Sequence, residues 1–259
     1  MAKINTRSHQ WYGWLPDLPD YRDFSYSVIA PRLAHLPAKV DLRSKCSPIE
    51  NQGQLGACTA HALVGALEFL QIKDDPKFVD LSRLFVYYNE RAIEGTVNQD
   101  SGAFLRDGIK SLAKQGVCPE KKWPYHINDF TKKPNRKCYT DAKKHQITSY
   151  HRISTVDEMR ICLAERYPFV FGFTVYEAFE SPAVAKSGVL NMPGPKEKVV
   201  GGHAVMAAGY DDSQKRFIIR NSWDTDWGRK GYFTMPYDYL DPAKNLADDF
   251  WTIRMSEEG

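Results

Sequence analysis

The pattern of apolar positions divides the chain into a helical first half and a strand-rich second half. Apolar residues recur at helical spacing over residues 58–70, which predicts a helix that begins near the start of this range. Two further helices are expected, one over residues 82–93 with Ser82 as its N-cap and one over 103–115 that Gly116 ends.

From residue 147 onward the pattern changes to short apolar runs with polar ends. Strands are predicted over residues 147–153, 169–175 and 231–235. One helix interrupts them, because Thr155 and Glu158 have the spacing of a capping box.

A β-hairpin is predicted in the later part of the chain. Two short strands, over residues 205–210 and 217–220, flank a cluster of turn-forming residues. A turn centred on Asp212 places His203 opposite Asn221, within one or two residues of register. The asparagine amide would then fix the tautomer and orientation of the imidazole.

Cys58 lies where a turn-forming stretch, residues 51–56, passes into the first predicted helix. Backbone N–H groups and the dipole at a helix N-terminus lower the pKa of a thiol, so we expect a nucleophilic thiolate here. His203 is the expected proton-shuttling partner. His61 is an alternative base, but it lies three residues after Cys58 and would compete for the same helix surface.

Taken singly, a cysteine or histidine in an apolar setting is more often a buried structural residue. The ordered set of Gln52, Cys58, His203 and Asn221 argues against that interpretation, because it resembles the active site of papain-family cysteine peptidases. The resemblance covers residues 36–251. It extends to the segments 36–43, 116–117, 123–125, 187–190, 221–223, 227–228 and 231–232.

The resemblance implies an α+β fold with a helical lobe, an antiparallel β-barrel-like lobe and an active site in the cleft between them. It also implies a division of the chain. Residues 1–35 would be an N-terminal extension and 36–259 the peptidase domain, with a helical lobe at about 46–145 and a β lobe at about 146–259 plus 36–45.

By the same resemblance, Gln52 and the backbone N–H of Cys58 would form the oxyanion hole. Trp223 would shield the bond between Asn221 and His203 from water. The expected substrate-binding residues are Gly102, Phe104, Gly172, Ala204 and Trp223. They imply an apolar or aromatic preference two residues before the scissile bond.

Three positions depart from the family pattern. Leu55 stands where a disulfide cysteine is usual, Thr59 where an aromatic residue follows the nucleophile, and Gly202 where plant enzymes often carry an acid. The first departure indicates a bacterial-type branch without the usual disulfides. None of the three removes a catalytic group.

The N-terminal extension is much shorter than the family's usual pro-segment, yet it is rich in aromatic residues such as Trp11, Tyr12 and Trp14. Pro16 and Pro19 keep it extended, which is the conformation that a substrate groove accepts. We expect an autoinhibitory segment that makes the chain a zymogen. The alternative is that it packs on the outer surface of the lobes.

The chain has 259 residues, of which 42% are hydrophobic, and a net charge of +3. We therefore expect a monomer that acts on protein or peptide substrates without a cofactor, a nucleic-acid partner or a membrane. A local excess of Lys and Arg over residues 110–144 is either a solvated face or a site for an anionic ligand. No apolar run at the N-terminus predicts a signal peptide or membrane span, and export by another route stays open.

Four cysteines besides Cys58 remain, and two interpretations of them are open. Cys118 and Cys138 could form a disulfide, or they could bind zinc together with His126 and His145.

Two other functions stay open beside hydrolysis. An acyltransferase or transglutaminase-like enzyme would use the same acyl-thioester, and a catalytically silent module would only bind peptides.

Overall fold

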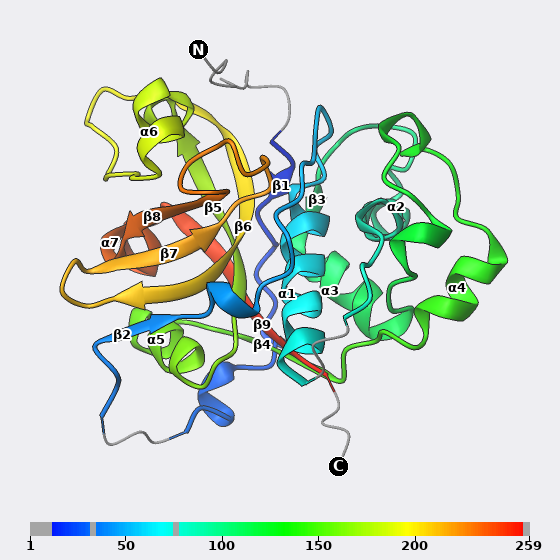
Figure 1. Ribbon diagram of the computed structural model, residues 1–259, viewed down its shortest axis with the longest axis horizontal. Coiled ribbons are helices and arrows are strands. Elements are labelled where there is room, and N and C mark those ends of the chain that lie inside the picture. The colour runs from blue at the N-terminus through cyan, green and yellow to red at the C-terminus, as the bar shows by residue number, and fades with distance from the viewer. Residues whose placement is uncertain (1–11, 32–34, 75–77, 256–259) are drawn as a thin grey trace.

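In the computed structural model, which describes residues 12–31, 35–74 and 78–255, helices gather on one side of the molecule and a β-sheet on the other (Figure 1). The helical side contains α1 (Cys58–Asp74), α2 (Arg83–Glu94), α3 (Leu105–Lys114) and α4 (Arg136–Ala142). This arrangement confirms the predicted α+β fold with two lobes.

The sheet of the second lobe is antiparallel and follows the order β4-β9-β5-β6-β7-β8, with β2 paired to β6. Its strands are β2 (Lys39–Asp41), β4 (Ser149–Arg152), β5 (Phe169–Tyr176), β6 (Val199–Asp211), β7 (Arg216–Arg220), β8 (Tyr232–Pro236) and β9 (Ala247–Arg254). The order ends at β4 and β8, which do not pair with each other, so the sheet curves without closing into a barrel. The short helices around it are α5 (Val156–Ala164), α6 (Pro182–Ser187) and α7 (Tyr237–Leu240).

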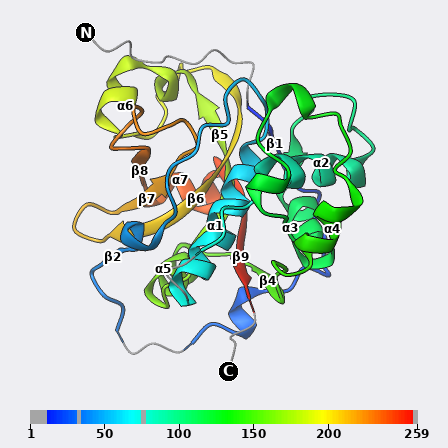
Figure 2. The same ribbon diagram turned by 45° about the vertical axis from the view of Figure 1, so that its right-hand side comes forward.

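Helix α1 lies at the junction of the two lobes and packs on β6 as well as on α2 and α3 (Figures 1 and 2). Its residues 58–70 are all buried, because one face meets the sheet and the others meet helices. The N-terminus of α1 therefore opens where the two lobes meet. Among the described residues, no helix is long and apolar enough to cross a membrane.

The predicted helix over 82–93 is confirmed as α2, and the hydroxyl of its N-cap Ser82 accepts from the Phe85 N–H at 3.1 Å. The helix predicted over 103–115 begins later than expected, at Leu105. The preceding residues form strand β3 (Ala103–Phe104), which pairs in parallel with β1 (Trp14–Leu15) of the N-terminal segment. No local pattern along the chain indicates this pairing.

The predicted hairpin is confirmed as β6 and β7, with a register shifted from the expected one by two residues at Met206 and by three nearer the turn. Met206 faces Arg220, and an irregularity between Ala207 and Gly209 changes the register along the hairpin. Strand β9 was not predicted, because the pair Asp248-Asp249 interrupts its apolar run.

Candidate active site

The Cys58 thiol reaches across from the helical lobe to strand β6. Cys58 is the first residue of α1, and the backbone N–H of Ala204 donates to its sulfur at 3.3 Å. His203, the neighbour of Ala204 on β6, is fully buried. The structure therefore brings together two predicted site residues that are separated by more than half of the sequence.

His203 is oriented by Asn221, at a distance of 2.9 Å between Nε2 and Oδ1. The same Oδ1 accepts from the backbone N–H of Ser222 at 2.8 Å, which identifies it as the carbonyl oxygen of the amide. Nε2 of His203 is therefore the donor, and proton exchange with a thiol falls to Nδ1. The Trp223 ring lies 5.1 Å from the imidazole and, at 4% exposure, covers this hydrogen bond from solvent.

Gln52 is fully buried, and its amide has a fixed orientation. Oε1 accepts from the Ser222 hydroxyl at 2.7 Å and from Trp223 Nε1 at 3.2 Å. Nε2 consequently faces the loop before Cys58, where it donates to the Leu55 carbonyl at 2.9 Å. A side-chain donor is thus held against the loop that leads into Cys58 by the residues that follow Asn221.

His61 lies on the helical side of the site. Its Nδ1 is 3.0 Å from the Ala57 carbonyl, and its ring meets Tyr125 edge-to-face at 4.9 Å. These contacts turn the ring toward its own lobe, whereas Cys58 contacts β6.

The N-terminal segment runs between the two lobes and across the site (Figures 1 and 2). The Tyr12 ring lies 5.6 Å from the His203 ring, and its hydroxyl donates to Glu180 Oε1 at 3.0 Å. Gly13 lies against the loop before Cys58, where a Cβ added to it would be 1.7 Å from the Gly56 carbonyl oxygen. Trp11, the first aromatic residue expected in this role, lies outside the described residues.

Gly13 and Trp14 lie against the predicted substrate-binding residues. The Gly13 carbonyl accepts from the Ala103 N–H at 2.7 Å, and a Cβ added to Gly102 would lie 2.2 Å from that carbonyl oxygen. A Cβ on Gly172 would lie 1.9 Å from the Trp14 indole, so only glycine admits this ring.

The other predicted substrate-binding residues surround the same segment. Ala204 pairs with Gly172 across β5 and β6, and Phe104 pairs with Leu15. Trp223 reaches it through Tyr12, with 6.0 Å between the rings.

Residues 36–243 match the model of the papain family of cysteine proteases. The chain belongs to that family. Its peptidase chemistry is therefore hydrolysis of peptide bonds, and the comparisons do not favour the acyltransferase or silent-module alternatives.

Individual relatives agree with this membership. Xylellain, a cysteine protease from Xylella fastidiosa, has a structure with 44% sequence identity and a TM-score of 0.87, and the match covers 98% of this chain and 99% of that one. An uncharacterized peptidase C1-like protein of Acanthamoeba polyphaga mimivirus is 44% identical over 214 residues, which are 79% of this chain and 68% of that protein. Chymopapain of Carica papaya is 29% identical over 227 residues, or 83% of this chain and 58% of chymopapain.

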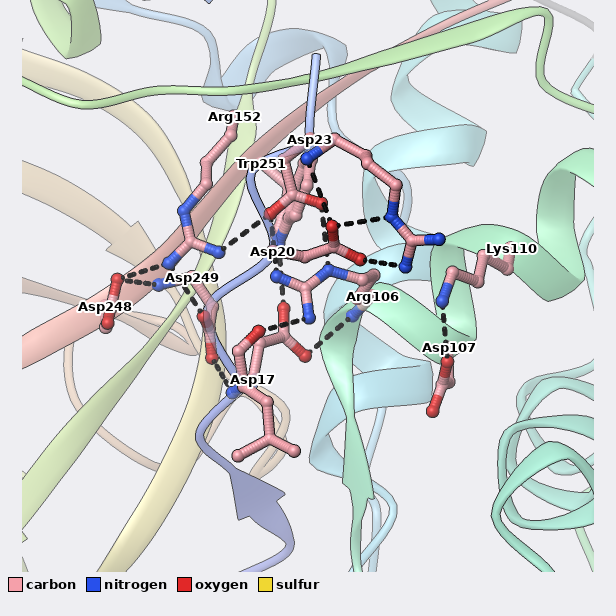
Figure 3. A network of polar contacts seen from close by, with 12 residues as sticks. Asp17, Asp20, Asp23, Arg106, Asp107, Lys110, Arg152, Asp248, Asp249 and Trp251 are labelled. Carbon is pink, nitrogen blue, oxygen red and sulfur yellow. Dashed lines mark hydrogen bonds and ion pairs between the residues drawn. The ribbon is translucent and has the colours of Figure 1, made fainter. Parts of the chain in front are cut away.

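A buried pair of carboxylates anchors the N-terminal segment of this papain-family chain (Figure 3). Asp249, on β9, is fully buried, and its Oδ2 accepts from Trp14 Nε1 at 3.0 Å and from the Asp17 N–H at 2.8 Å. Asp17 in turn accepts from Trp251 Nε1 at 3.1 Å. Asp249 of β9 thus accepts hydrogen bonds from the N-terminal segment, and Asp17 of that segment accepts one from β9. These bonds join the segment to β9.

Two arginines extend this anchor (Figure 3). Arg106, on α3, forms an ion pair with Asp23 at 2.7 Å and donates to the Leu18 carbonyl at 2.7 Å. Arg152, on β4, contacts Asp23 at 3.3 Å and Asp249 at 3.1 Å. This network was not predicted from the sequence. The available signal was the spacing of aspartates at 17, 20 and 23 and the acidic pair inside β9.

The lowered pKa expected for Cys58 is not found in this arrangement. The thiol is fully buried beneath the N-terminal segment, and this burial raises its pKa to about 11. The N–H groups of Ala204 and Gly13 favour the thiolate but do not compensate for the lost water. Cys58 therefore carries a neutral thiol when the N-terminal segment covers it.

The four remaining cysteines are free thiols and form no disulfide. Cys118 and Cys138 are free thiols that interact with each other, and the pKa of Cys118 is raised by burial and by this neighbour. Within the described residues, no group of His, Cys, Asp or Glu is arranged to hold a metal ion.

The basic region over residues 110–144 is partly neutralised by neighbouring acids. Lys132 pairs with Asp129 at 2.7 Å, and Lys110 pairs with Asp107 at 3.4 Å. An anionic ligand for this face stays a prediction.

Proposed function

We propose that this papain-family chain is a cysteine endopeptidase whose nucleophile is Cys58, whose acid and base is His203, and whose orienting residue is Asn221. The observation that carries the proposal is the convergence of three elements. α1 supplies the thiol, β6 supplies the imidazole, and the residues after β7 supply the amide that fixes the Nε2–H tautomer.

The chemistry follows from these positions. His203 takes the proton of the Cys58 thiol, and the sulfur attacks the peptide carbonyl. The negative oxygen that forms accepts hydrogen bonds from the Cys58 N–H and from Gln52 Nε2. His203 protonates the departing amine, which leaves an acyl-thioester on Cys58. His203 then takes a proton from water, and the resulting hydroxide attacks the thioester and releases the acid product. His203 returns its proton to the sulfur, which restores the thiol.

The N-terminal segment inhibits this activity by occupying the groove. Tyr12 covers His203, Gly13 lies against the Gly56 carbonyl beside Cys58, and Trp14 fills the space over Gly172. We accordingly divide the chain into an inhibitory extension, 1–35, and a peptidase domain, 36–259. Within that domain the helical lobe is about 46–145, and the β lobe is about 146–259 plus 36–45.

Trp14 also indicates the substrate preference. The Trp14 indole lies against Gly172 of β5 and is 8% exposed, so an aromatic or large apolar side chain of a substrate fits the same space. We propose that this side chain stands two residues before the scissile bond, in a protein or peptide substrate.

The test is cleavage of a peptide library under reducing conditions by the full-length chain carrying Trp14→Ala, analysed by mass spectrometry. We expect peptide cleavage that Cys58→Ala abolishes and that the matched variant Cys46→Ala leaves nearly intact. Addition of a primary amine separates hydrolysis from acyl transfer, because a transferase would give amide products. A covalent thiol reagent found on any cysteine other than Cys58 would refute the assignment of the nucleophile.

A further inference from the structure

Beside Cys58, Gly13 is enclosed between two backbone segments, one at Gly56 and one at Gly102. We call these two segments the walls of the peptide-binding space. A Cβ on Gly13 would lie 1.7 Å from the Gly56 carbonyl oxygen, and a Cβ on Gly102 would lie 2.2 Å from the Gly13 carbonyl oxygen. Gly13 therefore touches both walls at once. Any peptide that takes its place must fit the same separation between the loop that carries Cys58 and the strand that aligns the substrate.

These two walls come from separate elements, the turn before α1 and the turn before β3, and two side chains join them. The Gly56 N–H donates to Asp100 Oδ1 at 3.0 Å and to Oδ2 at 3.2 Å. The Tyr87 hydroxyl donates to Asp100 Oδ1 through a short hydrogen bond and accepts from the Gly102 N–H at 3.2 Å. All five cysteines are free, so no disulfide performs this task.

Tyr87 is a rigid centre for this bridge. Its side chain is fully buried on α2, and the guanidinium of Arg91 lies 4.0 Å from the centre of its ring. Arg91 also donates to the carbonyls of Val97 at 2.8 Å and Gln99 at 2.9 Å, which fixes the loop that presents Asp100. Burial and the adjacent carboxylate raise the pKa of Tyr87, so its phenol keeps the proton that it donates.

We infer that Tyr87 and Asp100 are positioning residues that set the separation between the nucleophile loop at Gly56 and the substrate-aligning strand at Gly102. The inference rests on the proposed function. Neither side chain touches the reacting atoms. Together they hold two backbone segments in the geometry that a bound peptide needs for attack by Cys58, and a misplacement of about 1 Å in such geometry costs on the order of 100-fold in rate.

The experiment compares two reagents on Cys58 in the full-length chain carrying Trp14→Ala. Iodoacetamide requires only a reactive thiol, whereas a dipeptidyl vinyl sulfone with an aromatic side chain must also lie along the Gly102 strand. Both second-order rates are measured by mass spectrometry, with Tyr87→Phe and Asp100→Ala as test variants. Tyr88→Phe, the neighbouring residue of α2, is the matched control, and Asp100→Asn restores one acceptor oxygen.

We expect the vinyl sulfone rate to fall about 10- to 100-fold in Tyr87→Phe and Asp100→Ala, with the iodoacetamide rate unchanged. Tyr88→Phe should react like the parent, and Asp100→Asn should recover part of the loss. An unchanged vinyl sulfone rate, or two rates that change together, would overturn the inference. A Trp14→Ala chain that reacts with iodoacetamide at Cys58 but hydrolyses no peptide would instead refute the proposed function.

Discussion

The indole N–H of Trp14 donates to the carboxylate of Asp249 at 3.0 Å, and both side chains are buried although 235 positions separate them in the sequence. This bond joins the N-terminal segment to β9 next to the candidate active site. The strength of inhibition should therefore depend on a contact that lies outside the catalytic residues.

Trp14→Ala in the full-length chain should raise peptidase activity at least tenfold. Loss of a buried tryptophan removes about 3–5 kcal/mol of packing, which here stabilises the seated segment. Trp14→Phe keeps a ring but loses the bond to Asp249 and should give an intermediate rate. Tyr21→Ala is the control, because Tyr21 lies on the same segment and is 99% exposed. Equal rates for all four chains would show that Trp14 does not hold the segment.

Binding of the N-terminal segment over the candidate active site should weaken as the pH rises. Burial and the nearby charge of Asp17 raise the pKa of Asp249 to about 7 from its ordinary value of 3.8, and burial also raises the pKa of Asp17. Removal of the segment returns water to Asp249, so the seated state holds its proton more tightly than the open state. This contribution to the stability of the bound N-terminal segment is fully present below about pH 4 and is lost as the pH rises through about 7.

Charged neighbours of Asp17 and Asp249 both lower and raise the pKa of these carboxyl groups. Arg152 and Arg106 favour the charged carboxylates, whereas Asp23 and Asp248 add negative charge to the cluster.

The measurement of this pH effect is the activity of the full-length chain divided by that of its Trp14→Ala variant, which cancels the pH profile of catalysis. The ratio should increase from pH 5 to pH 8, and Asp249→Asn should flatten it. A ratio that decreases over this range would contradict the prediction.

The reactivity of Cys58 should report whether the segment is seated. Burial raises the pKa of this thiol to about 11, so alkylation by iodoacetamide should be slow at pH 7 in the full-length chain. In Trp14→Ala the thiol regains water, His203 stays beside it, and the midpoint of the rate–pH profile should shift to lower pH. Identical profiles for the two chains would contradict the seated arrangement.

Gly172→Ala should change the substrate preference. The added Cβ would lie 1.9 Å from the position of the Trp14 ring, so it excludes both the segment and an aromatic substrate side chain. A library profile should shift from aromatic to small residues two positions before the scissile bond. Gly194→Ala is the matched control, because the nearest atom to its Cβ is 3.7 Å away. An unchanged aromatic preference would place the pocket elsewhere.

The convergence of Cys58, His203 and Asn221 was predictable because its signals are local. A turn followed by a helical pattern marked Cys58, and a hairpin pattern brought His203 near Asn221 even though the true register differs by two residues. A diagonal pair on one face of a hairpin is still within reach of long side chains, so the error in register did not separate these two residues.

The anchor of the N-terminal segment was not predictable for the opposite reason. Asp17 and Asp249 meet across 232 positions, and each has the ordinary appearance of a surface aspartate in the sequence. Strand β9 escaped detection because Asp249 interrupts it, and that residue adopts a positive φ of 57°. A pairing that depends on the completed fold leaves no periodic trace along the chain.

The most direct test of the central claim compares residues 36–259 with the full-length chain in hydrolysis of fluorogenic peptides under reducing conditions, with Cys58→Ala as the blank and circular dichroism to verify folding. The account predicts a faster rate, or the loss of a lag, for the truncated chain. It also predicts competitive inhibition when residues 1–35 are added back as a peptide, and no hydrolysis in the blank. A folded truncated chain with an unchanged rate and no inhibition by the peptide would contradict the account, as would hydrolysis that survives Cys58→Ala.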